Sequence, residues 1–290
     1  MKFLKTICVL LMLAPLSACG VGKFFIERSV NSIEEDIANE FKSFARFDQT
    51  QRQQIDEIAK QSADWIKTDR LVRLKVELEN VADDIEQGSA ISEKTWGSTI
   101  AFLERPLSMS SIPGLVEDIA QLTYGLSAEQ AQDVVEKLQK DHNTAIKQQS
   151  KNTLDDQNRK FARALKIVFA EMQISRSKAQ IKQAREMLKQ RQSHIDLEWQ
   201  EEQRNHLKFL NLVQDRRRPK SEYIEDFLQA WLRAEQGAKY LAPQKWQHNA
   251  RVAYSVMNYL LNDLEQAERK TAAKNVREYA QLFSDLSILK

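Results

Sequence analysis

Apolar residues recur every three or four positions along most of this chain, which is the spacing of one face of an α-helix. The first such stripe beyond the N-terminal region consists of Val30, Ile33, Ile37, Phe41 and Phe44. No segment alternates polar and β-branched residues over a sustained length, and the chain holds only 7 glycines and 5 prolines. The pattern therefore predicts an all-α protein.

The stripes and the interruptions between them predict about nine helices. One stripe changes phase near Thr68-Asp69, which predicts a break or kink, and the longest candidate helix covers about forty residues from Ser175 onwards. Because such lengths exceed those of helices in compact domains, we expect an elongated multi-helix bundle or a helical hairpin array. The loop at 106–114 is a candidate sub-boundary within a helical domain that covers residues 29–290.

Residues 1–18 have the pattern of a secretory signal peptide, with a positive start, a short apolar middle and small residues before the cleavage point. The apolar middle, residues 7–13, is too short to form a permanent membrane-spanning helix, which needs roughly 20 residues. The signal ends in Leu16-Ser17-Ala18, and Cys19 follows. These four residues resemble the lipobox of bacterial lipoproteins, and the alternative is a plain signal peptide that ends beside a cysteine.

The lipobox resemblance implies cleavage after Ala18 and fatty-acyl chains, such as palmitate, on Cys19. The membrane would then be a partner through this covalent lipid, and no other cofactor is expected. Gly20 rather than aspartate follows the cysteine, which by the same resemblance implies the outer membrane and a chain that faces the periplasm. Residues 19–28 are expected to form a lipidated tether, in which residues 24–26 either contact lipid headgroups or begin the core.

Charge and cysteine content narrow the classes of partner and chemistry. The chain has 43 basic and 41 acidic residues. Loss of Lys2 and Lys5 with the signal would leave 41 of each, so no global field favours nucleic acid, and a nucleic-acid partner is not expected. Cys8 would leave with the signal and Cys19 would carry lipid. The mature chain would therefore have no disulfide and no thiolate nucleophile.

Several predicted helices begin in the same way. Phe47-Asp48-x-x-Gln51 and Leu126-Ser127-x-x-Gln130 each join an apolar residue, a capping residue and a glutamine, and weaker versions begin at Ile174, Leu241 and Leu264. This arrangement is typical of a capping device at a helix N-terminus. It also resembles the Leu-Thr-x-x-Gln motif of small periplasmic helical chaperones.

The chain as a whole resembles a family of uncharacterised proteobacterial lipoproteins, classed as domain of unknown function 6279. The resemblance rests on the lipobox, on the apolar and aromatic helix that follows it, on the Phe47-Asp48-x-x-Gln51-Arg52 start and on the later helix starts. It implies an all-helical fold and an envelope location, and it implies no activity.

One set of side chains could hold a metal ion. His194, Glu198, Glu202 and His206 follow one another at steps of four along one predicted helix. Imidazole and carboxylate suit zinc or iron, but the two histidines would lie about 18 Å apart. Only the pair His194-Glu198 or the pair Glu202-His206 could share an ion, with further ligands from another helix. The alternative is ordinary pairing of side chains four residues apart.

The densest positive cluster consists of Arg216, Arg217, Arg218 and Lys220. It could contact the phosphates of anionic lipid or lipopolysaccharide. The alternative is a charged turn that the dipole at a helix C-terminus favours.

The sequence contains no catalytic motif, neither Gly-x-Ser-x-Gly nor His-Glu-x-x-His nor a phosphate-binding glycine loop. We therefore expect a non-enzymatic lipoprotein that acts as a protein-binding scaffold or envelope assembly factor. The alternatives are a chaperone-like binder of unfolded envelope proteins, a metal-binding protein that uses the His/Glu residues, and a purely structural spacer.

Overall fold

The computed structural model describes residues 21–91, 95, 109–149 and 153–288. Leu16, Ser17, Ala18 and Cys19, like the rest of the predicted signal peptide, lie outside the described residues, as does the first part of the predicted loop at 106–114. The described residues form helices and their connections, with no strand among them, so the prediction of an all-α fold is confirmed. The α-helices are α2 (Val21–Asn31), α3 (Ile33–Lys42), α4 (Gln49–Trp65), α5 (Leu71–Gln87), α7 (Leu115–Tyr124), α8 (Ala128–Gln149), α9 (Leu154–Glu171), α10 (Lys178–Leu188), α11 (Ile195–Gln214), α12 (Lys220–Leu241), α13 (Pro243–Asn262) and α14 (Gln266–Ile288).

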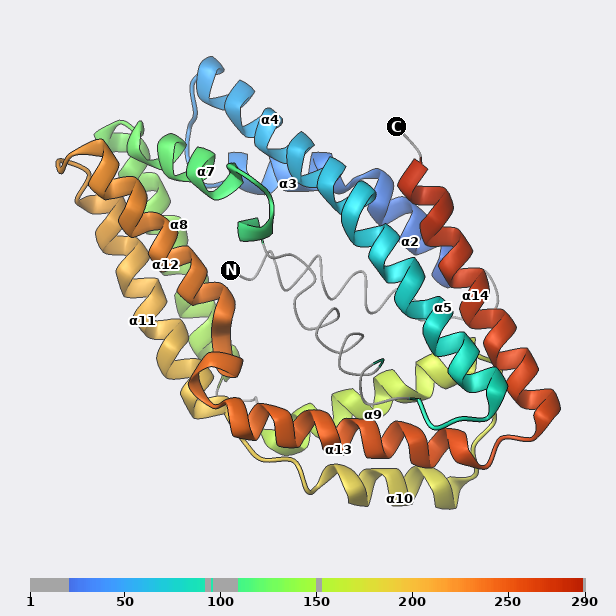
Figure 1. The fold of residues 1–290 in the computed structure, drawn as a ribbon. Coiled ribbons are helices and arrows are strands. Elements are labelled where there is room, and N and C mark those ends of the chain that lie inside the picture. The colour runs from blue at the N-terminus through green and yellow to red at the C-terminus, as the bar shows by residue number, and fades with distance from the viewer. Residues whose placement is uncertain (1–20, 92–94, 96–108, 150–152, 289–290) are drawn as a thin grey trace.

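The helices lie along the sides of a closed frame (Figure 1). Helices α8, α11 and α12 form one side, α9, α10 and α13 a second, and α5 and α14 a third together with α2. Helices α3, α4 and α7 close the frame between the first and third sides. Helices far apart in the chain pack side by side, as α5 does with α14 and α8 with α11, and three separate apolar clusters stabilise the arrangement.

The first apolar cluster joins α3, α4, α7, α8, α11 and α12, with buried residues from Ile33 to Ala230. It therefore includes residues from both sides of the loop at 106–114. The second cluster joins α5, α9, α10, α13 and α14. The third is small and joins α2 to α5 and α14. The chain thus stabilises its frame at several places along the perimeter.

The predicted break near Thr68-Asp69 is a change of helical register within a continuous helix. A π-helical turn at Ile66–Arg70 joins α4 directly to α5. A π turn accommodates one additional residue, so the apolar stripe moves to a new position without interrupting the backbone hydrogen bonds. The interpretation as a phase change is confirmed, and the interpretation as a break is wrong.

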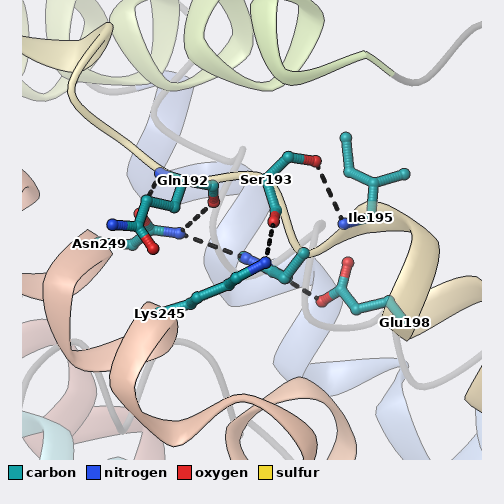
Figure 2. Close-up of polar contacts among 7 residues, drawn as sticks. Gln192, Ser193, Ile195, Glu198, Lys245 and Asn249 are labelled. Atoms are coloured by element: carbon teal, nitrogen blue, oxygen red, sulfur yellow. Dashed lines mark hydrogen bonds and ion pairs between the residues drawn. The ribbon is translucent and has the colours of Figure 1, made fainter.

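The predicted helix of about forty residues from Ser175 is also wrong, because it divides into α10 and α11 between residues 189 and 194. Side chains of α13 bind the backbone of this connection (Figure 2). Asn249 accepts a hydrogen bond from the Gln192 amide at 2.7 Å and donates one to the Gln192 carbonyl at 2.9 Å. Lys245 donates to the Ser193 carbonyl at 3.3 Å. These bonds satisfy backbone groups that a continuous helix would have paired internally.

Residues 21–28 of the predicted tether form most of α2, so the prediction of a tether over residues 19–28 is wrong from Val21 onwards. Ile26 is buried against α14, and Lys23 bonds Glu278 with an Nζ–Oε2 distance of 2.7 Å. Tertiary packing makes this segment the first described element of the fold. Of the residues expected either to contact lipid or to begin the core, Ile26 begins the core, whereas Phe24 is 58% exposed.

Candidate functional site

The first apolar cluster contains a cavity of about 190 Å³. Its wall includes Phe41 from α3, Phe44 just after α3, Phe209 from α11, and Phe227 and Trp231 from α12. Helices α7 and α8 complete it with aliphatic side chains such as Leu122 and Val134. Among the described residues that line this apolar pocket, only Glu40, Thr123 and Glu235 are polar.

Two capped helix starts contribute residues to one part of the wall of the apolar pocket. In α4, Asp48 accepts a hydrogen bond from the Gln51 amide at 2.9 Å, and the Gln51 side chain accepts one from the Asp48 amide at 3.0 Å. Ser127 and Gln130 make the same reciprocal bonds at the start of α8, at 3.1 and 2.9 Å. The apolar residues that precede these caps, Phe47 and Leu126, both line the pocket. The prediction that these starts are capping devices is therefore confirmed.

The two glutamines also bind one another. Gln130 Nε2 donates to Gln51 Oε1 at 2.6 Å, and Gln51 Nε2 donates to Gln130 Oε1 at 3.1 Å. Gln130 Nε2 also donates to the Arg46 carbonyl at 3.0 Å. Each side-chain amide thus completes the capping box of its own helix and also links that helix start to the other one. Residues 79 positions apart in the chain meet at the edge of the apolar pocket.

The aromatic wall is fixed by ring packing and by one carboxylate. Phe227 stacks on Trp231 with ring centroids 5.9 Å apart, and Phe209 meets both rings edge-on. Trp231 Nε1 donates to Glu235 at 2.7 Å, and the Ser110 amide donates to the same carboxylate at 3.2 Å. Ser110 belongs to the 3₁₀ turn at Met109–Ser111, so Glu235 fastens this turn to α12. These contacts preorganise the wall.

The predicted metal-ligating residues do not converge. His194 lies just before α11, where its Nε2 is 3.3 Å from Glu198 and its Nδ1 is 3.3 Å from the Asn249 amide nitrogen. The hydrogen bond to Glu198 raises the pKa of His194, although burial opposes this. Glu202 and His206 lie further along α11. No group of three or more His, Cys, Asp or Glu side chains that could hold a metal exists among the described residues.

His206 instead stacks on His142 of α8, with centroids 3.9 Å apart and planes within 9°. The ring of His142 also stacks on Trp199 at 5.6 Å. His206 Nε2 is buried and has no hydrogen-bond partner in the described part of the chain. Burial, with a smaller contribution from the charge of His142, lowers the pKa of His206 from 6.5 to about 4.

We expect this stack to make stability depend on pH. Between pH 6.5 and 4 the unfolded chain binds a proton at His206 that the folded protein does not, so stability falls as pH falls through this range. The full difference corresponds to about 3 kcal/mol, and partial exposure of the ring reduces our expectation to about 1 kcal/mol between pH 7 and 5.

Urea unfolding of the wild type and of His206→Phe at both pH values measures this contribution. The variant should lose less stability on acidification than the wild type, and His248→Phe serves as a matched control outside the stack. Equal losses in wild type and His206→Phe would contradict the assignment. His194, whose pKa is raised, contributes with the opposite sign and is common to all three proteins.

The predicted anion-binding cluster is mostly engaged with the protein. Arg216 donates to the Ser127 carbonyl at 3.3 Å, Arg218 pairs with Asp226, and Lys220 donates to Gln121 at 3.4 Å. These contacts join the α11–α12 connection to the region of α7 and the start of α8, which favours the interpretation as a charged turn. Arg217 is exposed.

Sequence reasoning missed two features. Glu201 of α11 is buried, with a side chain only 5% exposed, and pairs with Arg204 and with Arg233 of α12, each at 2.7 Å. The three-residue step from Glu201 to Arg204 was a visible signal, whereas the pairing with Arg233 was not. The apolar pocket was the other omission, because its walls come from elements far apart in the chain.

No helix in the described part of the chain combines the length and the apolar character needed to cross a membrane. No protein-family model matches this chain, and comparisons with curated proteins and with solved structures give no match.

Proposed function

We propose that this protein is a lipid-anchored helical lipoprotein that faces the periplasm and binds a protein partner without catalysing a reaction. The apolar pocket is the observation that carries the proposal. Its wall is aromatic and preorganised, and preorganised aromatic pockets are where protein partners place the side chains that contribute most to affinity. The lipobox resemblance supports the anchor and the outer-membrane location.

The size of the pocket favours a side chain as its occupant. Pockets for small-molecule ligands usually measure about 300–1,000 Å³, whereas a cavity of about 150 Å³ holds a benzene ring. At about 190 Å³ the apolar pocket matches one aromatic or branched aliphatic side chain. Its presence also favours a binding protein over a structural spacer.

A chaperone-like binder of unfolded envelope proteins is the second candidate. The two capped starts that resemble the chaperone motif are joined by Gln51 and Gln130 beside the pocket, which favours this alternative. A metal-binding function has less support, because neither His/Glu pair has a third ligand among the described residues.

Filling the pocket tests the proposal. Ala234 lines it and is 9% exposed, so Ala234→Phe should occupy the space that a partner side chain would take. We expect the variant to fold and its affinity for the partner to fall at least tenfold. Ala234→Leu is a smaller substitution that fills the pocket if a phenylalanine ring does not fit. Leu232→Phe, on the exposed part of the same helix, is the matched control.

The measurement is photocrosslinking in living cells, with a photoreactive residue in place of Phe44 in the full-length protein. Discrete adducts that disappear with Ala234→Phe and persist with Leu232→Phe would support a dedicated partner. A broad set of adducts with the same dependence would support the chaperone-like alternative. Adducts that are insensitive to filling of the pocket would contradict both.

A further inference from the structure

The apolar pocket has an acidic border, and this border bears on the partner's chemistry. Glu40 lies in the last turn of α3, and Phe44 follows two residues after the helix ends. Both line the pocket. The Glu40 carboxylate is half-buried and has no hydrogen bond or ion pair among the described residues. Glu235 adds a second carboxylate to the lining.

No lysine or arginine is found among the described residues that line the pocket. Two lysines close to Glu40 or Phe44 pair with other carboxylates. Lys42 pairs with Asp56 at 2.5 Å, and Lys137, whose Nζ lies 5.7 Å from the centroid of the Phe44 ring, pairs with Asp141 at 3.3 Å. The described part of the lining is therefore apolar and negatively charged and contributes no cation.

We infer that the partner is a protein segment in which the aromatic or branched apolar side chain that enters the pocket is accompanied by a lysine or arginine, whose cation pairs with Glu40. This inference rests on the proposed binding function. A partner helix could present the two residues four positions apart on one face, and Glu40 and Phe44 are also four positions apart in the chain.

The physical reason is desolvation. A segment that covers the pocket removes water from the half-buried Glu40 carboxylate, and a neutral segment would leave that charge without compensation. A cation in the segment compensates it. An acidic segment would add repulsion, so the border selects against acidic apolar sequences as well as for basic ones. Most of this selectivity should appear in association rate and salt dependence.

The test uses full-length lipidated protein in nanodiscs and three fluorescent helical peptides of 15 residues. Each peptide has a central tryptophan, and the position four residues away is lysine, glutamine or glutamate. Fluorescence anisotropy gives the affinities. We expect the lysine peptide to bind about tenfold more tightly than the glutamate peptide, with a difference that shrinks in high salt.

Glu40→Gln should lower the affinity for the lysine peptide about five- to tenfold and leave the affinity for the glutamine peptide unchanged. Glu40→Lys should reverse the order of affinities, so that the glutamate peptide binds more tightly than the lysine peptide. Glu34→Gln, an exposed carboxylate on the same helix that does not line the pocket, is the matched control and should change nothing.

Two other outcomes are distinguishable. If all three peptides bind equally and Ala234→Phe abolishes binding, the inference about charge is wrong and the proposed function stands. If no peptide binds, or if binding is insensitive to Ala234→Phe, the proposed function is wrong and the inference is wrong with it.

Discussion

Replacement of Arg204 and Arg233 together by methionine should destabilise the fold by about 3 kcal/mol. The two guanidinium groups are the partners of Glu201, whose side chain is only 5% exposed. Without them a buried carboxylate loses both counter-charges, and breaking a buried pair in this way costs several kcal/mol. We place the effect at the lower end of that range because both arginines are partly exposed and water can reach their positions.

Urea unfolding followed by circular dichroism measures this effect. Adding Glu201→Leu to the double variant should recover most of the lost stability, because an apolar side chain removes the unpaired charge and packs between α11 and α12. Arg204→Met alone should cost about 1 kcal/mol, since Arg233 still pairs with Glu201. If the triple variant is no more stable than the double variant, the loss comes from packing of the arginine stems.

Cys19→Ala should abolish membrane attachment. Each buried methylene of an acyl chain contributes about 0.8 kcal/mol, and one chain holds a protein only marginally whereas two or more hold it stably. We therefore expect the acyl chains on Cys19 to be the main anchor. Fractionation of cells should show the wild type in membranes. The variant should be found in the soluble fraction or as the precursor with an uncleaved signal peptide.

Cys8→Ala is the matched control, because Cys8 lies in the predicted signal peptide and should not affect attachment. Metabolic labelling with a palmitate analogue should mark the wild type and Cys8→Ala but not Cys19→Ala. Gly20→Asp tests the predicted location separately, since the lipoprotein resemblance implies retention at the inner membrane. Membrane attachment and labelling of Cys19→Ala equal to those of the wild type would contradict the lipobox interpretation.

Local sequence features predicted what depends on neighbours within a few residues. The helical class follows from the three- and four-residue recurrence of apolar positions such as Ile33 and Ile37, which are both buried. The starts at Asp48 and Ser127 follow from capping chemistry, in which one side chain bonds an amide three residues away. The phase change at Ile66–Arg70 was visible for the same reason, because the apolar stripe records the register of the helix.

Packing between distant elements decided the rest. Residues 189–194 leave the helix because Asn249 and Lys245 of α13 bind their backbone. Residues 21–28 become helical because Ile26 packs on α14. His206 stacks on His142 of α8, and Gln51 meets Gln130 from another helix.

The apolar pocket belongs to this second group, since Phe41 and Trp231 lie far apart in the chain and line one pocket only after α3 and α12 have docked. The hydrophobic pattern encodes which positions are buried. The hydrophobic effect is non-directional, however, so the pattern does not specify which residues a buried side chain packs against. Hydrogen-bond geometry and side-chain shape select the partners, and both become defined only in the folded protein.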